Sequence, residues 1–133
     1  LVAMKYSQEN RIYPLSFNRK EIKDHGEGGN IIGTDPCGDV MIIDDVLSAG
    51  TAARESIHLI ESLQANAKLF VVGLDRQEKG AGTISAKAEL ERDFNIVVES
   101  IVNLDALIQF SKHSEHFHAY QIQLQEYRET WGA

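Results

Sequence analysis

The feature that most constrains this chain is the stretch of residues 40–52, which reads VMIIDDVLSAGTA. The four apolar residues 40–43 predict a strand that is buried on both faces, as in a parallel sheet. Asp44 and Asp45 follow where this strand should end. The small residues 48–51 then lead into a helical pattern. Such a turn before a helix predicts an anion site, because its backbone N–H groups and the helix dipole both favour negative charge.

The two acids predict that a second kind of group sits beside the anion. A carboxylate does not bind phosphate directly, but it accepts hydrogen bonds from sugar hydroxyls or meets a hydrated cation. On a regular strand Asp44 and Asp45 would point to opposite faces, so they serve one ligand only if the backbone turns there. The alternative is an ordinary strand end with one helix-capping acid. The turn is not a Walker-type loop, because the Gly-x-x-x-x-Gly-Lys spacing is absent. Phosphate, ribose and Mg²⁺ together suggest a phosphoribosyl ligand.

The rest of the chain alternates strand and helix patterns, which predicts an α/β domain with a parallel sheet. Strands are expected at residues 12–17, 30–33, 68–74 and 96–102. Helices are expected at residues 51–64, 85–93, from 103 onward and 115–131, with residues 1–10 as the tail of another helix. Ser85 and Asn103 are the candidate N-caps. Ligands of such a sheet bind at the carboxyl ends of the strands, where Asp44, Asp45 and Arg76 fall.

Length and charge narrow the class of protein. A chain of 133 residues predicts a single domain over 1–133. The net charge of −7 argues against nucleic acid or an anionic membrane as the main partner. The single cysteine, Cys37, cannot form an internal disulfide, so a cytoplasmic location is expected.

Three further groups of residues have both a functional and an ordinary interpretation. Residues 19–25 carry four basic side chains and are followed by a glycine-rich run; composition alone favours a solvated charged loop. Arg76 is either half of an Asp75–Arg76 surface pair or a bidentate ligand for a carboxylate. For the histidines of residues 113–118, a solvated polar face is favoured over a metal site.

Three segments of the chain resemble one enzyme family. Residues 40–52 resemble the signature of the type I phosphoribosyltransferases, which bind 5-phosphoribosyl-1-diphosphate (PRPP). Residues 17–29, FNRKEIKDHGEGG, resemble the mobile catalytic loop of orotate phosphoribosyltransferase, and residues 74–80, LDRQEKG, resemble its orotate-contacting segment. The resemblance covers nearly all of this chain, but a long N-terminal stretch of the family has no counterpart. It implies a partial, C-terminal phosphoribosyltransferase domain with a three-layer fold, in which helices flank a mainly parallel sheet.

The resemblance also implies an activity and its residues. The reaction would transfer the phosphoribosyl group of PRPP to orotate, giving orotidine 5′-monophosphate and pyrophosphate in pyrimidine (UMP) biosynthesis. Mg²⁺ would be carried by PRPP, with no direct protein ligand. Residues 19–30 would form the mobile catalytic loop and reach the neighbouring site of a homodimer. Catalysis is assigned to Lys23, His25 and Asp45, and orotate binding to Ser48 and Arg76. PRPP binding is assigned to Arg19, Lys20, Lys23, His25, Asp44, Asp45, Val46, Leu47, Ser48, Ala49, Gly50, Thr51 and Ala52.

Two other classes of function stay open. One is a regulator of the same fold that senses PRPP or nucleotides without catalysis; the leaving-group chemistry of Lys23 and His25 argues against it. The other is a purine phosphoribosyltransferase with the same PRPP loop; the segment around Arg76 argues for orotate instead.

Overall fold

The computed structural model describes residues 13–18 and 31–133. Two predictions, the helix tail of residues 1–10 and the basic loop of residues 19–30, lie outside these ranges. The chain divides after residue 37 into two compact units, which are described here one at a time.

The described part of the first unit is a short hairpin. Strand β1 (Ser16–Asn18) pairs antiparallel with β2 (Ile31–Gly33). The prediction of a strand at residues 30–33 is confirmed for residues 31–33, the part of it that the structure describes. The predicted strand at 12–17 is shorter and begins later, because β2 offers only three residues for pairing.

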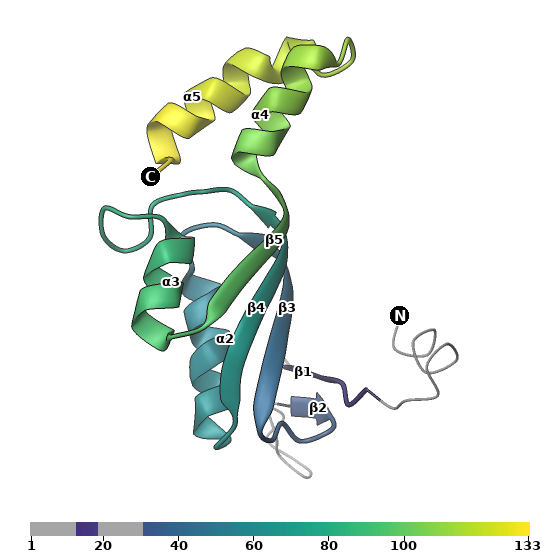
Figure 1. Ribbon diagram of the computed structural model, residues 1–133, viewed down its shortest axis with the longest axis vertical. Helices are drawn as coiled ribbons and strands as arrows, with labels where there is room; N and C mark the ends of the chain where they lie inside the picture. The colour runs from purple at the N-terminus through teal and green to yellow at the C-terminus, as the bar shows by residue number, and fades with distance from the viewer. Residues whose placement is uncertain (1–12, 19–30) are drawn as a thin grey trace, which may run out of the picture. The chain divides into compact units, whose positions relative to one another are not determined.

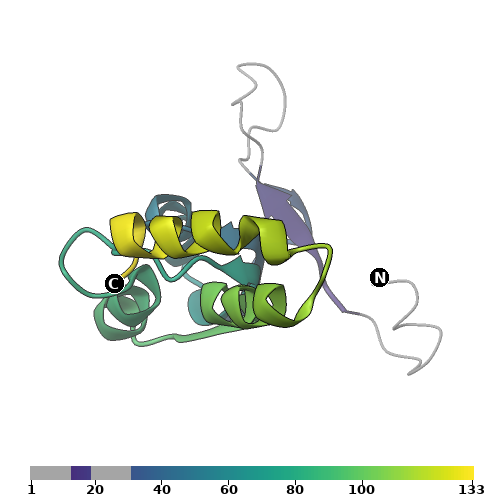
Figure 2. The ribbon, with the colours of Figure 1, turned by 90° about the horizontal axis from the view of Figure 1, so that it is seen from above.

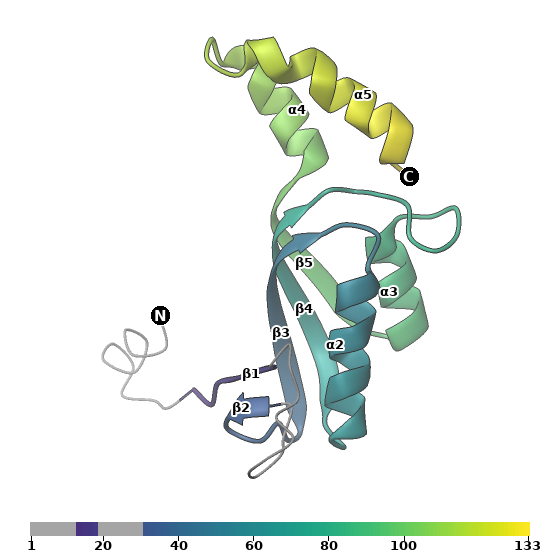
Figure 3. The ribbon, with the colours of Figure 1, turned by 180° about the vertical axis from the view of Figure 1, so that it is seen from behind.

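The second unit is built on a parallel three-stranded sheet in the order β3-β4-β5. Helix α2 follows β3, and helix α3 follows β4, so each pair of neighbouring strands is joined by a helical crossover. Both helices cover the same face of the sheet (Figures 1 and 3). The predicted α/β architecture is therefore confirmed. The bounds are β3 (Asp39–Leu47), α2 (Thr51–Ser62), β4 (Asn66–Asp75), α3 (Ala86–Phe94) and β5 (Val97–Asn103).

The core lies between this sheet and its two helices. Phe70 and Val72 of β4 meet Ile57 of α2 and Leu90 of α3, and all four side chains are at most 1% exposed. Helix α2 buries Ala53, Ile57 and Ile60 at the predicted helical spacing.

The prediction that β3 is buried on both faces is wrong. Met41 and Ile43 are 54% and 63% exposed, whereas Ile42 between them packs against the core. Ile101 of β5 is 80% exposed as well. In the described residues the helices cover one face only, so burial alternates along the strand. The run of four apolar residues concealed this alternation.

Strand β3 also continues through the two acids, where we expected it to end. Its pairing with β4 extends as far as Leu47 opposite Asp75. A parallel partner that is itself long supplies hydrogen bonds to these residues, so the backbone stays extended for three residues beyond Asp44.

Two helices follow the sheet. Helix α4 (Leu104–His113) starts at the predicted N-cap Asn103, and a 3₁₀ turn, η1 (His118–Tyr120), leads into α5 (Gln121–Trp131). Figure 2 shows α4 and α5 side by side. The helix predicted from residue 115 begins later because residues 114–118 turn instead, with the Phe117 and His118 N–H groups both bonded to the Ser114 carbonyl. Over residues 13–18 and 31–133, no helix is long and apolar enough to cross a membrane.

Candidate functional site

The ends of β3 and β4 bring the predicted anion turn and Arg76 together. The backbone N–H of Arg76 donates to the Leu47 carbonyl at 3.0 Å. Ser48, the first residue of the turn, follows Leu47 directly. The predicted juxtaposition at the carboxyl edge of the sheet is therefore present.

The turn depends on Gly50. This residue is the N-cap of α2 and has φ +87° and ψ 7°, in the left-handed region. A Cβ at this position would also lie 3.4 Å from the Cβ of Ala86. Glycine is favoured here because other residues reach this conformation only with strain.

Helix α2 differs from the two helices that follow it in how it begins. The Ser85 hydroxyl caps α3 by accepting from the Ala88 N–H at 3.2 Å, and the Asn103 side chain caps α4 by accepting from the Ala106 N–H at 2.9 Å. No side chain in the described residues caps α2, and its first turn carries no acid. The N-terminal N–H groups of α2 are thus left for an external acceptor.

Asp44 and Asp45 lie within β3, upstream of this turn. The backbone N–H of Asp45 donates to Asp44 Oδ1 at 2.9 Å. Asp44 is half-buried and Asp45 is exposed. Their consecutive positions in a continuous strand direct them to opposite faces, and the backbone turns only after Leu47. Within the described residues neither carboxylate has a cationic partner, so both remain available to hydroxyls or a hydrated cation.

Arg76 does not pair with Asp75. Asp75 is only 6% exposed, and its carboxylate accepts from the Gln77 N–H at 2.8 Å. The Arg76 guanidinium instead lies 3.4 Å from the Tyr127 hydroxyl and 3.6 Å from a Glu78 carboxylate oxygen, measured from Nη1. The hydrogen bond with Tyr127 is the main cause that raises the pKa of Arg76, so it stays a cation.

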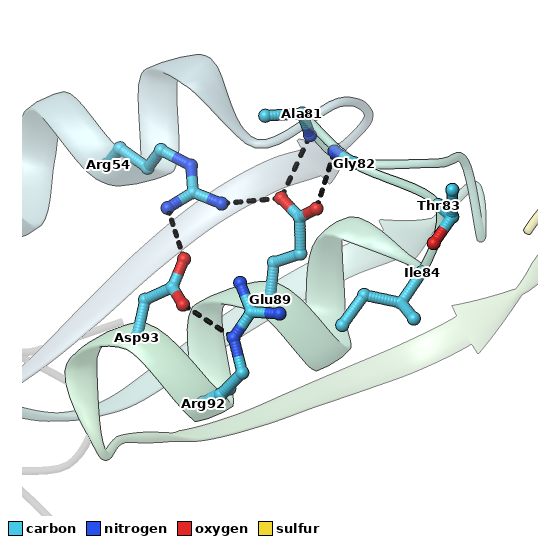
Figure 4. A pocket seen from close by; sticks show the side chains of 8 residues that line it. All are labelled: Arg54, Ala81, Gly82, Thr83, Ile84, Glu89, Arg92 and Asp93. Carbon is cyan, nitrogen blue, oxygen red and sulfur yellow. Dashed lines mark hydrogen bonds and ion pairs between the residues drawn. The ribbon is translucent and has the colours of Figure 1, made fainter.

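Sequence reasoning missed a network that joins α2, α3 and the loop after β4 (Figure 4). Arg54 donates to Glu89 at 2.7 Å and to Asp93 at 2.9 Å. Glu89 is 3% exposed and also accepts from the N–H groups of Ala81 at 2.8 Å and Gly82 at 2.7 Å. These two backbone hydrogen bonds are the main cause that lowers the pKa of Glu89.

The network lines a pocket of about 580 Å³, formed by Arg54, Ala81, Gly82, Thr83, Ile84, Glu89, Arg92 and Asp93. Arg92 also bonds to Asp93, at 2.7 Å. The arginines and carboxylates of this pocket pair with one another, which indicates a structural role in holding α2, α3 and the loop together. The acids on α3 were the sequence signal for this network. Arg54, which pairs with Glu89, lies 35 residues away in the sequence, so the pairing could not be read from the pattern.

The remaining predicted site residues have mixed outcomes. Val46 is half-buried and Leu47 is buried in the core, while Ala49, Thr51 and Ala52 are exposed around the turn. The basic residues Arg19, Lys20, Lys23 and His25 lie outside the described residues. Across the described ranges, no group of three or more His, Cys, Asp or Glu side chains is placed to hold a metal ion.

Solved structures with this fold define the class of protein. The chain resembles orotate phosphoribosyltransferase from Francisella tularensis, with a TM-score of 0.72 and 30% identity over 99% of this chain and 62% of that one. It also resembles the enzyme of that name from Aeropyrum pernix, with a TM-score of 0.61 and 26% identity over 84% and 58% of the two chains. The fold is that of a type I phosphoribosyltransferase.

Curated relatives match most of this chain. Orotate phosphoribosyltransferase from Actinobacillus pleuropneumoniae serotype 5b is 48% identical over 119 residues, which are 90% of this chain and 56% of the relative. The protein of that name from Marinobacter nauticus is 43% identical over 132 residues, 99% of this chain and 62% of the relative. Nearly the whole of this chain is therefore homologous to a part of these orotate phosphoribosyltransferases. It spans a little over half the length of these relatives. No family model matches it.

Proposed function

We propose that this chain binds PRPP and transfers its phosphoribosyl group to orotate, giving orotidine 5′-monophosphate and pyrophosphate in pyrimidine (UMP) biosynthesis. One observation carries the proposal: the turn that leads to the uncapped start of α2, with Gly50 as its N-cap, begins beside Arg76 at the carboxyl edge of the sheet. The relatives named orotate phosphoribosyltransferase, at 43–49% identity, support it.

The turn supplies the binding site for the 5′-phosphate. The N–H groups at the start of α2 donate to the phosphate oxygens, and the helix dipole adds a favourable field. Asp44 and Asp45 accept hydrogen bonds from the ribose hydroxyls. Because β3 directs the two side chains to opposite faces, contact of both with one sugar requires the backbone at Asp44 and Asp45 to turn when the ligand binds.

The chemical step breaks the bond from ribose C1 to pyrophosphate and forms a bond from C1 to a ring nitrogen of orotate, which gives up its proton. Positive charge develops on the sugar and negative charge on the leaving group. Cations that contact the leaving group therefore stabilise the transition state more than the ground state. This role falls to Lys23 and His25, with Arg19 and Lys20 as further pyrophosphate ligands and Asp45 beside the sugar. These assignments stay predictions.

Orotate is distinguished from a purine by its carboxylate. The Arg76 side chain is 44% exposed and lies next to the turn, so its guanidinium can donate two hydrogen bonds to one carboxylate. Ser48, the first residue of the turn, supplies a hydroxyl that can contact orotate. A purine lacks the anionic group that Arg76 recognises, which favours orotate.

Mg²⁺, the homodimer and the cytoplasmic location complete the proposal. Mg²⁺ would be carried by the pyrophosphate oxygens of PRPP, with no direct protein ligand. Asp44 and Asp45, which no described cation neutralises, would meet the water shell of the metal. When bound, the metal would neutralise the charge of the leaving group. A second copy would supply the loop of residues 19–30 to the neighbouring site.

Calorimetric titration of PRPP with Mg²⁺ into this chain tests the proposal. The variant Asp44→Asn/Asp45→Asn should lose at least about tenfold in affinity, because each carboxylate bonds to the ribose. The matched control is Asp35→Asn/Asp39→Asn, which makes the same charge change at exposed positions before and at the start of β3. An equal loss in both variants, or saturable binding unchanged in the first, would count against the assignment.

A further inference from the structure

The segment that carries Arg76 is held in a strained conformation. Gln77, the next residue, has φ +54°, a left-handed value that is uncommon for a residue other than glycine. Its side-chain carbonyl accepts from the Asp105 N–H at 2.8 Å, and its side-chain amide donates to the Asp105 carboxylate at 3.0 Å. Strain of this kind persists only where surrounding contacts determine the conformation.

Those contacts come largely from the end of α5. The Lys79 N–H donates to the Trp131 carbonyl at 2.9 Å, and the Ala133 N–H donates to the Gln77 carbonyl at 3.1 Å. Arg128 of α5 donates to the Gln77 side chain at 3.2 Å and to Asp105 at 2.5 Å. The last turn of α5 and the residues after it therefore fix the backbone around Arg76.

Tyr127, one residue earlier on α5, reaches the guanidinium itself. Its hydroxyl donates to the Glu78 carboxylate, and the same oxygen lies 3.4 Å from Arg76 Nη1. Glu78 is largely buried, with a side chain 12% exposed. Among the described residues, Tyr127 and Glu78 both meet Arg76 at Nη1, which leaves the other guanidinium nitrogens for a planar anion.

We propose that Tyr127 is a positioning residue for Arg76, and that α5 thereby sets selection for a carboxylate-bearing base. This inference rests on the proposed function, because orotate is the ligand that Arg76 would meet. A long side chain held in place before binding loses less conformational entropy when the ligand arrives. Tyr127 also holds Glu78 with its hydroxyl, so the acid does not swing across the open side of Arg76.

The variant Tyr127→Phe removes the hydroxyl and keeps the ring. Orotate affinity, measured by calorimetry, should fall about 3- to 10-fold, as expected when one rotamer-rich side chain is no longer held. The affinity for PRPP with Mg²⁺ should not change. The matched control is Tyr120→Phe, which loses a hydroxyl at a 58% exposed position in η1 and should alter neither affinity.

A double-mutant cycle separates positioning from general damage. In an Arg76→Ala background, Tyr127→Phe should cause no further loss of orotate affinity, because its effect passes through the arginine. An equal loss in both backgrounds would overturn the proposal.

Side-chain NMR of the ligand-free chain gives a readout independent of orotate. The Arg76 Nε–H signal should show restricted motion in the wild type and in Tyr120→Phe, and faster motion in Tyr127→Phe. Equal mobility in all three proteins would overturn the inference. Restricted Arg76 motion in a wild type that binds no orotate would contradict the proposed function, while supporting the restraint of Arg76 by Tyr127.

Discussion

At the scale of single residues, Glu89 shows how a buried charge is kept ionised. Its carboxylate accepts two backbone hydrogen bonds and one from Arg54. A side chain at Gly80 would collide with this carboxylate. Glycine at position 80 therefore leaves room for the Glu89 carboxylate. The ionised carboxylate of Glu89 in turn holds the loop of residues 80–82 to α3.

Acid should weaken this contact. The folded pKa of Glu89 lies below its ordinary value of 4.5, so its contribution to stability is fully present above that value. The contribution is lost as the pH falls through the lower folded pKa. Urea unfolding between about pH 6 and about pH 3 should show a steeper loss for the wild type than for Glu89→Gln.

The control for this titration is Glu55→Gln, a change of an exposed acid on α2. Its pH dependence should match that of the wild type. Parallel curves for the wild type and Glu89→Gln would show that Glu89 does not carry the acid response.

At the scale of elements, the three helices that leave the sheet strands begin in two different ways. Helices α3 and α4 are capped by their own side chains, and α2 is not. Caps at Ser85 and Asn103 stabilise their helices directly. The uncapped start of α2 gives up that stabilisation and leaves its N–H groups available for a ligand.

The variant Ser85→Ala should lower the free energy of unfolding by about 1 kcal/mol, as N-cap removal usually does. Ser62→Ala serves as the control, because the Ser62 hydroxyl bonds to the Leu59 carbonyl in the last turn of α2. That change should stay within about 0.5 kcal/mol. Equal losses in urea unfolding would show that the Ser85 cap is not what stabilises α3.

The elements were predictable where a local pattern determined them. A helical pattern predicted α2, and the caps predicted the starts of α3 and α4. The open face of β3 was missed because consecutive apolar residues do not reveal which face a helix covers. The start of α5 was missed because the polar residues after His113 carry no strong period.

At the scale of the whole molecule, the described core lies on one side of the sheet. Ile57 is fully buried, whereas Ile101 is 80% exposed on the other side. A domain is stable by only about 5–15 kcal/mol, so one buried residue accounts for a large share of that free energy.

The variant Ile57→Ala should therefore lose about 2–5 kcal/mol of unfolding free energy through lost burial and a cavity. Ile101→Ala removes the same atoms from an exposed position and should change stability by less than about 0.5 kcal/mol. Both values come from urea unfolding. A loss at Ile101 close to that at Ile57 would show that its face of the sheet is packed in solution.

Some features of the candidate site follow from the local sequence, and others depend on contacts between residues that are distant in the sequence. The anion turn and Arg76 were predictable because each follows a strand in the sequence. The contact between Arg76 and Tyr127 joins residues that are 51 positions apart in the sequence. No local sequence pattern around either residue predicts it. The sequence likewise placed Asp44 and Asp45 in the site but not within β3, because the end of a strand depends on the length of its partner.

The order of strands in the sheet has a consequence for how the chain assembles. Each strand pairs with its neighbour in the chain, so the sheet can grow one crossover at a time with short loop closures. The attachment of α5 to residues 76–79 spans a longer separation and involves few buried apolar groups. Local opening of this attachment costs less free energy than global unfolding. We therefore expect the attachment that holds the Arg76 side chain to form after the sheet during folding and to open before the sheet does.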